Sequence, residues 1–136
     1  MKALTLTQPW ASLVALGHKQ VETRSWRTQY RGPIAIHAAK GFPSEARRFA
    51  ELERAIGRIP DRIPRGAVVC IIDLVDCQPT EEVALRISGL ERHLGDYAPG
   101  RWAWLFDPAS LRAFDEPLAA KGALSLWEWE SPSRER

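Results

Sequence analysis

Residues 67–75 place the strongest constraint on the fold. Their sequence, AVVCIIDLV, has apolar side chains at both odd and even positions and only one charge. Successive side chains of a β-strand point to opposite faces of a sheet, so a strand here is apolar on both faces. Such a strand belongs in the centre of a sheet that is covered on both sides. The rest of the chain must therefore supply neighbouring strands and two covers.

The remaining segments predict short elements without a regular alternation of strand and helix. Strand-like patterns cover residues 2–7, 19–26, 33–39, 101–106, 111–114 and 123–130, with a break at Asp107 and Pro108. Helical patterns cover residues 10–16, ended by Gly17, and residues 44–57. This predicts an α+β fold: a small mixed β-barrel of about six strands with two or three short helices. We expect one domain over residues 1–130, followed by a charged tail at 131–136.

The two cysteines, Cys70 and Cys77, lie in or beside this central strand. In one strand they would be roughly 23 Å apart at about 3.3 Å per residue, whereas a disulfide needs Cα atoms within about 7 Å. Two cysteines are also too few for a structural zinc site. We therefore expect buried thiols in a reducing compartment. With no apolar run near the roughly 18 residues of a membrane span, the sequence predicts a cytoplasmic protein without a membrane partner.

Motifs for cofactors and metals are missing from the sequence. There is no glycine-rich phosphate loop, HExxH or GxSxG, and neither His18 nor His93 has a metal-ligand spacing with His37. We therefore expect no cofactor and no metal.

Charge is distributed unevenly along the chain. Residues 1–65 contain twelve Lys or Arg and five Asp or Glu, giving +7, whereas residues 66–136 contain seven and twelve, giving −5. This split favours a basic face for an anionic partner if the fold keeps the halves apart. The alternative is that the two halves pair with each other.

The stretch LGHKQVETRSW, residues 16–26, concentrates charge beside an aromatic residue. On a strand, Glu22, Arg24 and Trp26 share one face, and Val21 and Thr23 share the other. Val21 and Thr23 suit a core, so the charged face is exposed or lines a cleft. Lys19 lies at the turn and can swing to either side. An exposed ion pair stabilises a fold by only about 0–1 kcal/mol, so both a structural salt bridge and a binding site stay open.

Six tryptophans are many for one small core. Trp102 and Trp104 share a strand face, as do Trp127 and Trp129, which is typical of barrel packing. We expect most of them in the core and one or two in a stacking wall, which would suit a nucleobase.

Three further residues are weaker ligand-binding candidates. His37, predicted to point away from Ile34 and Ile36, is followed by Lys40, and the two could donate hydrogen bonds to a phosphate. A hydrogen-bonded structural histidine is the alternative. Arg65 is chosen for its charge and expected placement.

Four segments together resemble the ASCH (activating signal cointegrator homology) domain, a branch of the PUA-like β-barrel superfamily. They are LTLTQPWASLVALGHKQVETRSW, YRGPIAIHAAK, DYAPGRWAWLF and KGALSLWEW, within residues 2–130. The family's GxKxxExR element corresponds here to Gly17, Lys19, Glu22 and Arg24. The resemblance implies a barrel whose cleft, carrying this element, binds RNA or a nucleotide-like ligand.

The resemblance also suggests roles for the candidate residues. Lys19 would be a mobile point charge for a phosphate or carbonyl oxygen, and Arg24 would offer a planar fork of donors. Glu22 would orient Arg24 or accept from a base amino group. Gln8 and Trp10 would supply a base-edge amide and a stacking face, beside Trp26.

Two other functions remain open. One branch of the superfamily resembles amidohydrolases of acetylated cytidine, in which a Thr follows the Lys by three residues, but Glu22 stands there in this chain. Some ASCH proteins are described as ribonucleases. For a hydrolase, Lys19 is the catalytic candidate. The amidohydrolase would also need a carboxylate, from Glu81, Glu82, Glu91 or Asp96, whereas a ribonuclease would use the Lys19, Glu22 and Arg24 cleft for metal-free phosphoryl transfer. The second open function is a protein-interaction module of the coactivator type.

Overall fold

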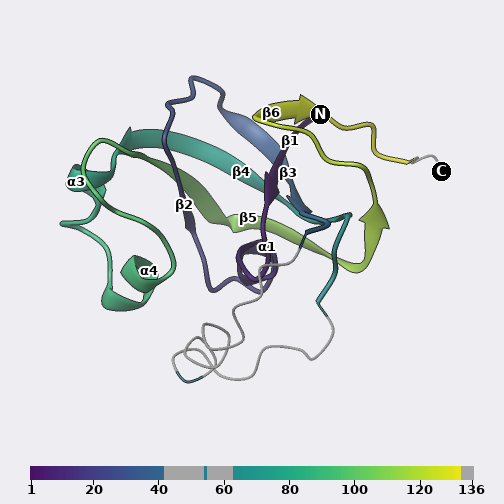
Figure 1. The fold of residues 1–136 in the computed structure, drawn as a ribbon, viewed down its shortest axis with the longest axis horizontal. Helices are drawn as coiled ribbons and strands as arrows, with labels where there is room; N and C mark the ends of the chain where they lie inside the picture. The colour runs from purple at the N-terminus through teal and green to yellow at the C-terminus, as the bar shows by residue number, and fades with distance from the viewer. Residues whose placement is uncertain (42–53, 55–62, 133–136) are drawn as a thin grey trace.

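The computed structural model describes residues 1–41, 54 and 63–132, and Figure 1 shows their arrangement. One curled six-stranded sheet has the order β2-β5-β4-β3-β1-β6. The strands are β1 (Lys2–Leu6), β2 (Val21–Arg24), β3 (Gly32–Ala38), β4 (Ala67–Pro79), β5 (Trp102–Ala119) and β6 (Leu126–Glu128). The short helices are α1 (Trp10–Ala15), α3 (Thr80–Val83) and α4 (Gly89–His93). The predicted small mixed barrel is confirmed as a curled half-barrel; the helix expected over 44–57 lies outside the described residues.

Strand β4 has the central position predicted from its sequence. It pairs with β3 on one side and with β5 on the other, both antiparallel. Neighbouring residues of β3 and β4 separate into two cores: Ile36 and Cys70 pack in the larger core with α1, while Ala35 and Val68 pack in a smaller one on the opposite face. Because both faces are covered, the strand is apolar at odd and even positions alike.

The break predicted at Asp107 and Pro108 is wrong, because β5 runs continuously past it. Pairing with β4 passes from Asp73–Asp107 to Ile71–Arg112, so residues 108–111 bulge out opposite one residue of β4. Proline has no N–H to donate to a neighbouring strand. Here the Ser110 hydroxyl oxygen accepts from the Asp73 amide at 2.8 Å in place of a backbone carbonyl. A bulge therefore accommodates the proline without ending the strand.

The last strand is shorter than the predicted range 123–130. Strand β6 covers only Leu126–Glu128, because its pairing with β1 extends over residues 2–4 of that strand. Beyond Leu4 the edge of β1 is not covered by β6, and this exposes Thr5 to the two hollows described below.

The strands of the two oppositely charged halves are interleaved in the described part of the chain. β1, β2 and β3 come from the basic half and β4, β5 and β6 from the acidic half, yet the sheet order places β2 beside β5 and β6 beside β1. Among the described strands, the charge split along the sequence is therefore not carried into a separation in space.

Both cysteines are buried free thiols on β4, as expected. Burial raises the pKa of the Cys70 thiol to about 12, so it stays protonated near neutral pH. In the part of the chain that the structure describes, no helix is both long enough and apolar enough to cross a membrane.

We predict that the native protein resists thiol reagents at pH 7–8. Both thiols should react within minutes in denaturant and far more slowly without it, because the reactive species is an accessible thiolate. Absorbance after addition of a chromogenic disulfide reagent measures this. A rapid reaction of one thiol in the native state would contradict the described burial.

The segment after β5 approaches β1 and β3 so closely that it requires a glycine. A Cβ on Gly122 would lie 2.6 Å from Cε1 of His37 and 2.8 Å from the Thr5 hydroxyl oxygen. We predict that Gly122→Ala lowers the free energy of unfolding by about 1–3 kcal/mol. Gly89→Ala is the control, because a Cβ there meets nothing within 4 Å. Urea denaturation should distinguish the two, and equal midpoints would contradict the close approach.

Candidate functional site

The glycine of the GxKxxExR element ends α1. Gly17 has φ +85°, a conformation that strongly favours glycine. Its amide donates to Val14 O at 3.0 Å, and the amide of His18 donates to Leu13 O at 2.9 Å. This pair of hydrogen bonds is a Schellman motif, which closes a helix and turns the chain sharply. The turn directs the next residues back beneath the helix.

Lys19 enters the protein interior at this turn and is only 2% exposed. Its ammonium donates to Val21 O at 2.7 Å and to Leu94 O, the latter just after α4. Nζ also lies 3.5 Å from Oε1 of Glu22 and 5.5 Å from the centre of the Trp10 ring. Burial lowers the pKa of Lys19, and the nearby carboxylates of Glu22 and Glu91 oppose that shift. The expected mobile charge is thus an anchored one, a correction to the sequence-based interpretation.

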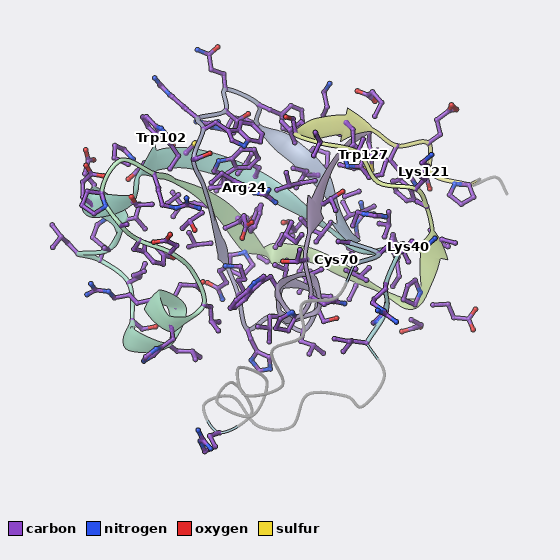
Figure 2. The ribbon with its side chains drawn as sticks, in the orientation of Figure 1. Arg24, Lys40, Cys70, Trp102, Lys121 and Trp127 are labelled. Atoms are coloured by element: carbon purple, nitrogen blue, oxygen red, sulfur yellow. The ribbon has the colours of Figure 1, made fainter. Side chains whose placement is uncertain are left out.

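Glu22 connects Lys19 to Arg24. One carboxylate oxygen faces Lys19, and the other lies 3.0 Å from Nε of Arg24, close enough for an ion pair but without hydrogen-bond alignment. A second nitrogen of Arg24 contacts another strand: Nη2 donates a hydrogen bond to the carbonyl oxygen of Thr5, on β1, at 2.8 Å. In Figure 2, Arg24 lies between β2 and β1. The guanidinium is therefore held at two points while its side chain stays 25% exposed.

Glu22, Arg24 and Thr5 border a cleft of about 300 Å³ between the end of β1, the start of α1 and β2. The predicted alternation of β2 is confirmed: Val21 and Thr23 are buried, whereas Glu22 and Arg24 are partly exposed. Glu22 and Arg24 line the cleft, and Thr23 also borders it. Trp10 and Trp26 line it as well, so two of the six tryptophans border a ligand-sized space. Trp104 is fully buried and meets Trp26 edge to face at 4.7 Å, which holds Trp26 in place.

Gln8 does not offer its amide to the cleft. It is fully buried, and its Nε2 donates to the Ser12 hydroxyl at 2.8 Å and to Pro64 O at 2.6 Å. Its Oε1 accepts from the Ser12 amide at 3.0 Å. The side chain thus braces the first turn of α1, and the expected base-edge amide is already occupied by the protein.

The three weaker candidates lie together at a different place. His37, Lys40 and Arg65 line a second hollow, of about 1030 Å³, on the other side of Thr5. His37 is buried with both ring nitrogens engaged, as the structural alternative predicted.

Arg101 was not among the sequence-based candidates, yet it lines the cleft. Its guanidinium donates to Thr23 O and to Asp96 O, each at 3.2 Å, and its Nε is 3.6 Å from a carboxylate oxygen of Asp96. Its position directly before the tryptophan strand, in the segment PGRWAW, was the available signal.

Of the four carboxylates considered as partners of Lys19, Glu91 comes near it. Its Oε1 accepts from the Gln20 amide at 3.0 Å, and burial raises its pKa. Burial is also the main cause of the raised pKa of Tyr97, with Glu91 and Glu22 adding to it. Asp96 pairs with Arg101, while Glu81 and Glu82 are exposed on α3. Among the described residues, no three of His, Cys, Asp or Glu gather where they could hold a metal ion.

We predict that Lys19→Met lowers the free energy of unfolding by about 3–5 kcal/mol, because Glu22 and two carbonyls lose a buried partner. Lys2→Met is the control: its pair with Glu128, at 3.1 Å, is exposed and contributes about 0–1 kcal/mol. Chemical denaturation of both variants tests this. Equal losses would show that Lys19 is not the anchor that its contacts indicate.

Comparison with known proteins identifies a family for this chain. The ASCH domain family model matches residues 4–109. Activating signal cointegrator 1 from Homo sapiens is 39% identical over 80 residues, covering 54% of this chain and 14% of that protein. The Mus musculus protein of the same name is 37% identical over 81 residues, with the same shares. The chain thus spans about one seventh of the length of these relatives.

Solved structures share the fold at low sequence identity. The crystal structure of ASCH from Zymomonas mobilis superposes with a TM-score of 0.59 at 16% identity, over 96% of this chain and 87% of that one. A point mutant of the Zymomonas mobilis protein gives a TM-score of 0.56 at 16% identity, over 96% and 90%. With a family model matching over residues 4–109, this chain belongs to the ASCH domain family.

Proposed function

We propose that the chain binds single-stranded RNA, or a nucleotide-like ligand, by holding one base in the cleft between β1, α1 and β2. The ASCH family is generally associated with RNA binding, which makes RNA the first partner to consider. The observation that carries the proposal is the convergence of a fixed but accessible Arg24 with Trp10 and Trp26 on one small cleft.

Arg24 has the properties of a recognition residue. A guanidinium has five N–H donors, and the contacts with Thr5 O and Glu22 occupy only part of them. The remaining donors suit a phosphate oxygen or the acceptors of a base edge. Because Glu22 and Thr5 already restrict the side chain, little further ordering is needed when a ligand binds. Arg101 adds a second positive charge to the lining, against one negative charge from Glu22.

The aromatic residues and the size of the cleft favour a single base. Stacking of a base on an aromatic side chain contributes about 1–3 kcal/mol and tolerates any base. A volume of about 300 Å³ lies at the lower end of small-molecule sites. A nucleoside-sized group matches this space, and an unpaired base offers its edges, which an RNA duplex hides.

Hydrolysis receives less support from the position of Lys19. An ammonium has three donors, and Val21 O, Leu94 O and Glu22 face all three. Lys19 is also not among the residues that line the cleft. In this arrangement the side chain orients Glu22 and is not placed to act as a base or nucleophile on a ligand.

We predict that Arg24→Ala weakens binding of a nucleoside monophosphate by about 5- to 150-fold, corresponding to about 1–3 kcal/mol. Arg24→Lys should recover only part of the loss, because an ammonium cannot reproduce the planar fork. Tryptophan fluorescence and NMR titration, with acetylated cytidine among the ligands, measure the affinity and place the contacts.

Arg112→Ala is the matched control, since Arg112 is exposed and lines neither hollow. Equal affinities of the Arg24→Ala and Arg112→Ala proteins would refute the role of the cleft. Mass analysis of the ligand after titration separates binding from hydrolysis: an intact ligand supports a binding module, and loss of the acetyl group would establish an enzyme.

A further inference from the structure

The second hollow is larger than the cleft and differs from it in character. It lies between Thr5 of β1, the end of β3, the turn before β4 and the segment after β5. Most of its lining is apolar, and its charged members are Lys40, Arg65 and Lys121. Among the described residues that line it, none is acidic. Figure 2 shows Lys40 and Lys121 on the same side of the molecule, away from Trp102.

A network of partly buried hydrogen bonds holds the floor of this hollow. The Trp127 indole N–H donates to the Thr5 hydroxyl oxygen at 3.0 Å, and that hydroxyl lies 3.1 Å from Nδ1 of His37. His37 Nε2 lies 2.7 Å from Ala120 O, a carbonyl that can only accept. The proton of a neutral His37 is therefore on Nε2, and Nδ1 accepts from Thr5. All donors are matched, so the floor is preformed.

Backbone contacts bring the cationic segments to the rim. Gly66, with φ +63°, donates its amide to Ala38 O at 2.8 Å and accepts from the Ala120 amide at 3.0 Å. These bonds tie together the segments that carry Lys40, Arg65 and Lys121. Lys40 and Lys121 are exposed, so their ammonium groups are accessible to a ligand.

Thr5 separates the hollow from the cleft. Its hydroxyl belongs to the floor of the hollow, while its carbonyl accepts from Arg24, and it lines both spaces. A strand with one base beside Arg24 could therefore pass directly over Thr5 into the hollow.

We propose that this hollow binds the sugar–phosphate backbone of the same single strand whose base occupies the cleft. The cations of the lining can contact phosphates of a strand, and the apolar lining suits the apolar faces of the sugars. The inference rests on the proposed function. It adds a second site with a different role, because the cleft holds a base whereas the hollow senses the length and charge of the strand.

The test compares two probes, cytidine monophosphate and a mixed-sequence RNA octamer, on the full chain. Lys40→Ala combined with Lys121→Ala should weaken octamer binding on the order of tenfold at 0.1 M salt and leave the monophosphate unaffected. The slope of log affinity against log salt should become shallower by about 1.4, from two lost contacts on a single strand. Replacing both lysines by arginine should retain octamer binding.

The matched control combines Arg92→Ala with Arg112→Ala, which removes two exposed cations that line neither hollow. If the octamer depends on Arg24 but the lysine and control variants behave alike, the hollow is overturned and the proposed function stands. If the octamer depends on the lysines but not on Arg24, the cleft is overturned, and with it the continuity between the sites. If neither the octamer nor the monophosphate binds the unaltered protein, both proposals are overturned. If only the monophosphate binds, the hollow is overturned and the cleft remains a nucleotide site.

Discussion

The buried ammonium of Lys19 is the interaction on which the candidate site depends. Removing a charge from water costs several kcal/mol, which only well-placed partners can offset. The three partners come from two segments: the Val21 carbonyl and the Glu22 carboxylate from β2, and the Leu94 carbonyl from just after α4. Satisfying this charge thus fixes the end of α1 and the start of β2 relative to the loop after α4. It also fixes Glu22, and through it the orientation of Arg24.

This arrangement gives each position of the GxKxxExR element a separate physical role. Gly17 supplies the left-handed turn that closes α1, and Lys19 anchors that turn in the interior. Glu22 connects the anchor to the surface, and Arg24 meets the cleft. Only Glu22 and Arg24 border the cleft, and the first two members of the element thus act on the fold. Substitutions at those two positions should therefore affect stability before they affect affinity.

Thr5 gives the molecule two adjoining hollows of different chemistry. The pairing of β1 with β6 extends only as far as Leu4, which lies opposite the first residue of β6. The next residue of β1 is therefore left between the cleft and the basic hollow. The cleft is small, polar and bordered by tryptophans, which suits a base. The hollow is larger, apolar and rimmed by cations, which suits a backbone. Together they would match the two repeating parts of a nucleic-acid strand.

Features that follow from local periodicity were predictable from the sequence alone. They include the central position of β4, the separate faces of β2 and the turn at Gly17, because alternation and backbone preference act within a few residues. Contacts between distant residues were decided only by the tertiary structure. The sequence leaves the direction of the Lys19 side chain open, and the carbonyl of Leu94, 75 residues later, decides it. In the same way, His37 is held by Ala120, which is 83 residues away. The place of Arg101 in the cleft and the bulge that carries Pro108 were likewise set by strand pairing, which sequence patterns do not specify.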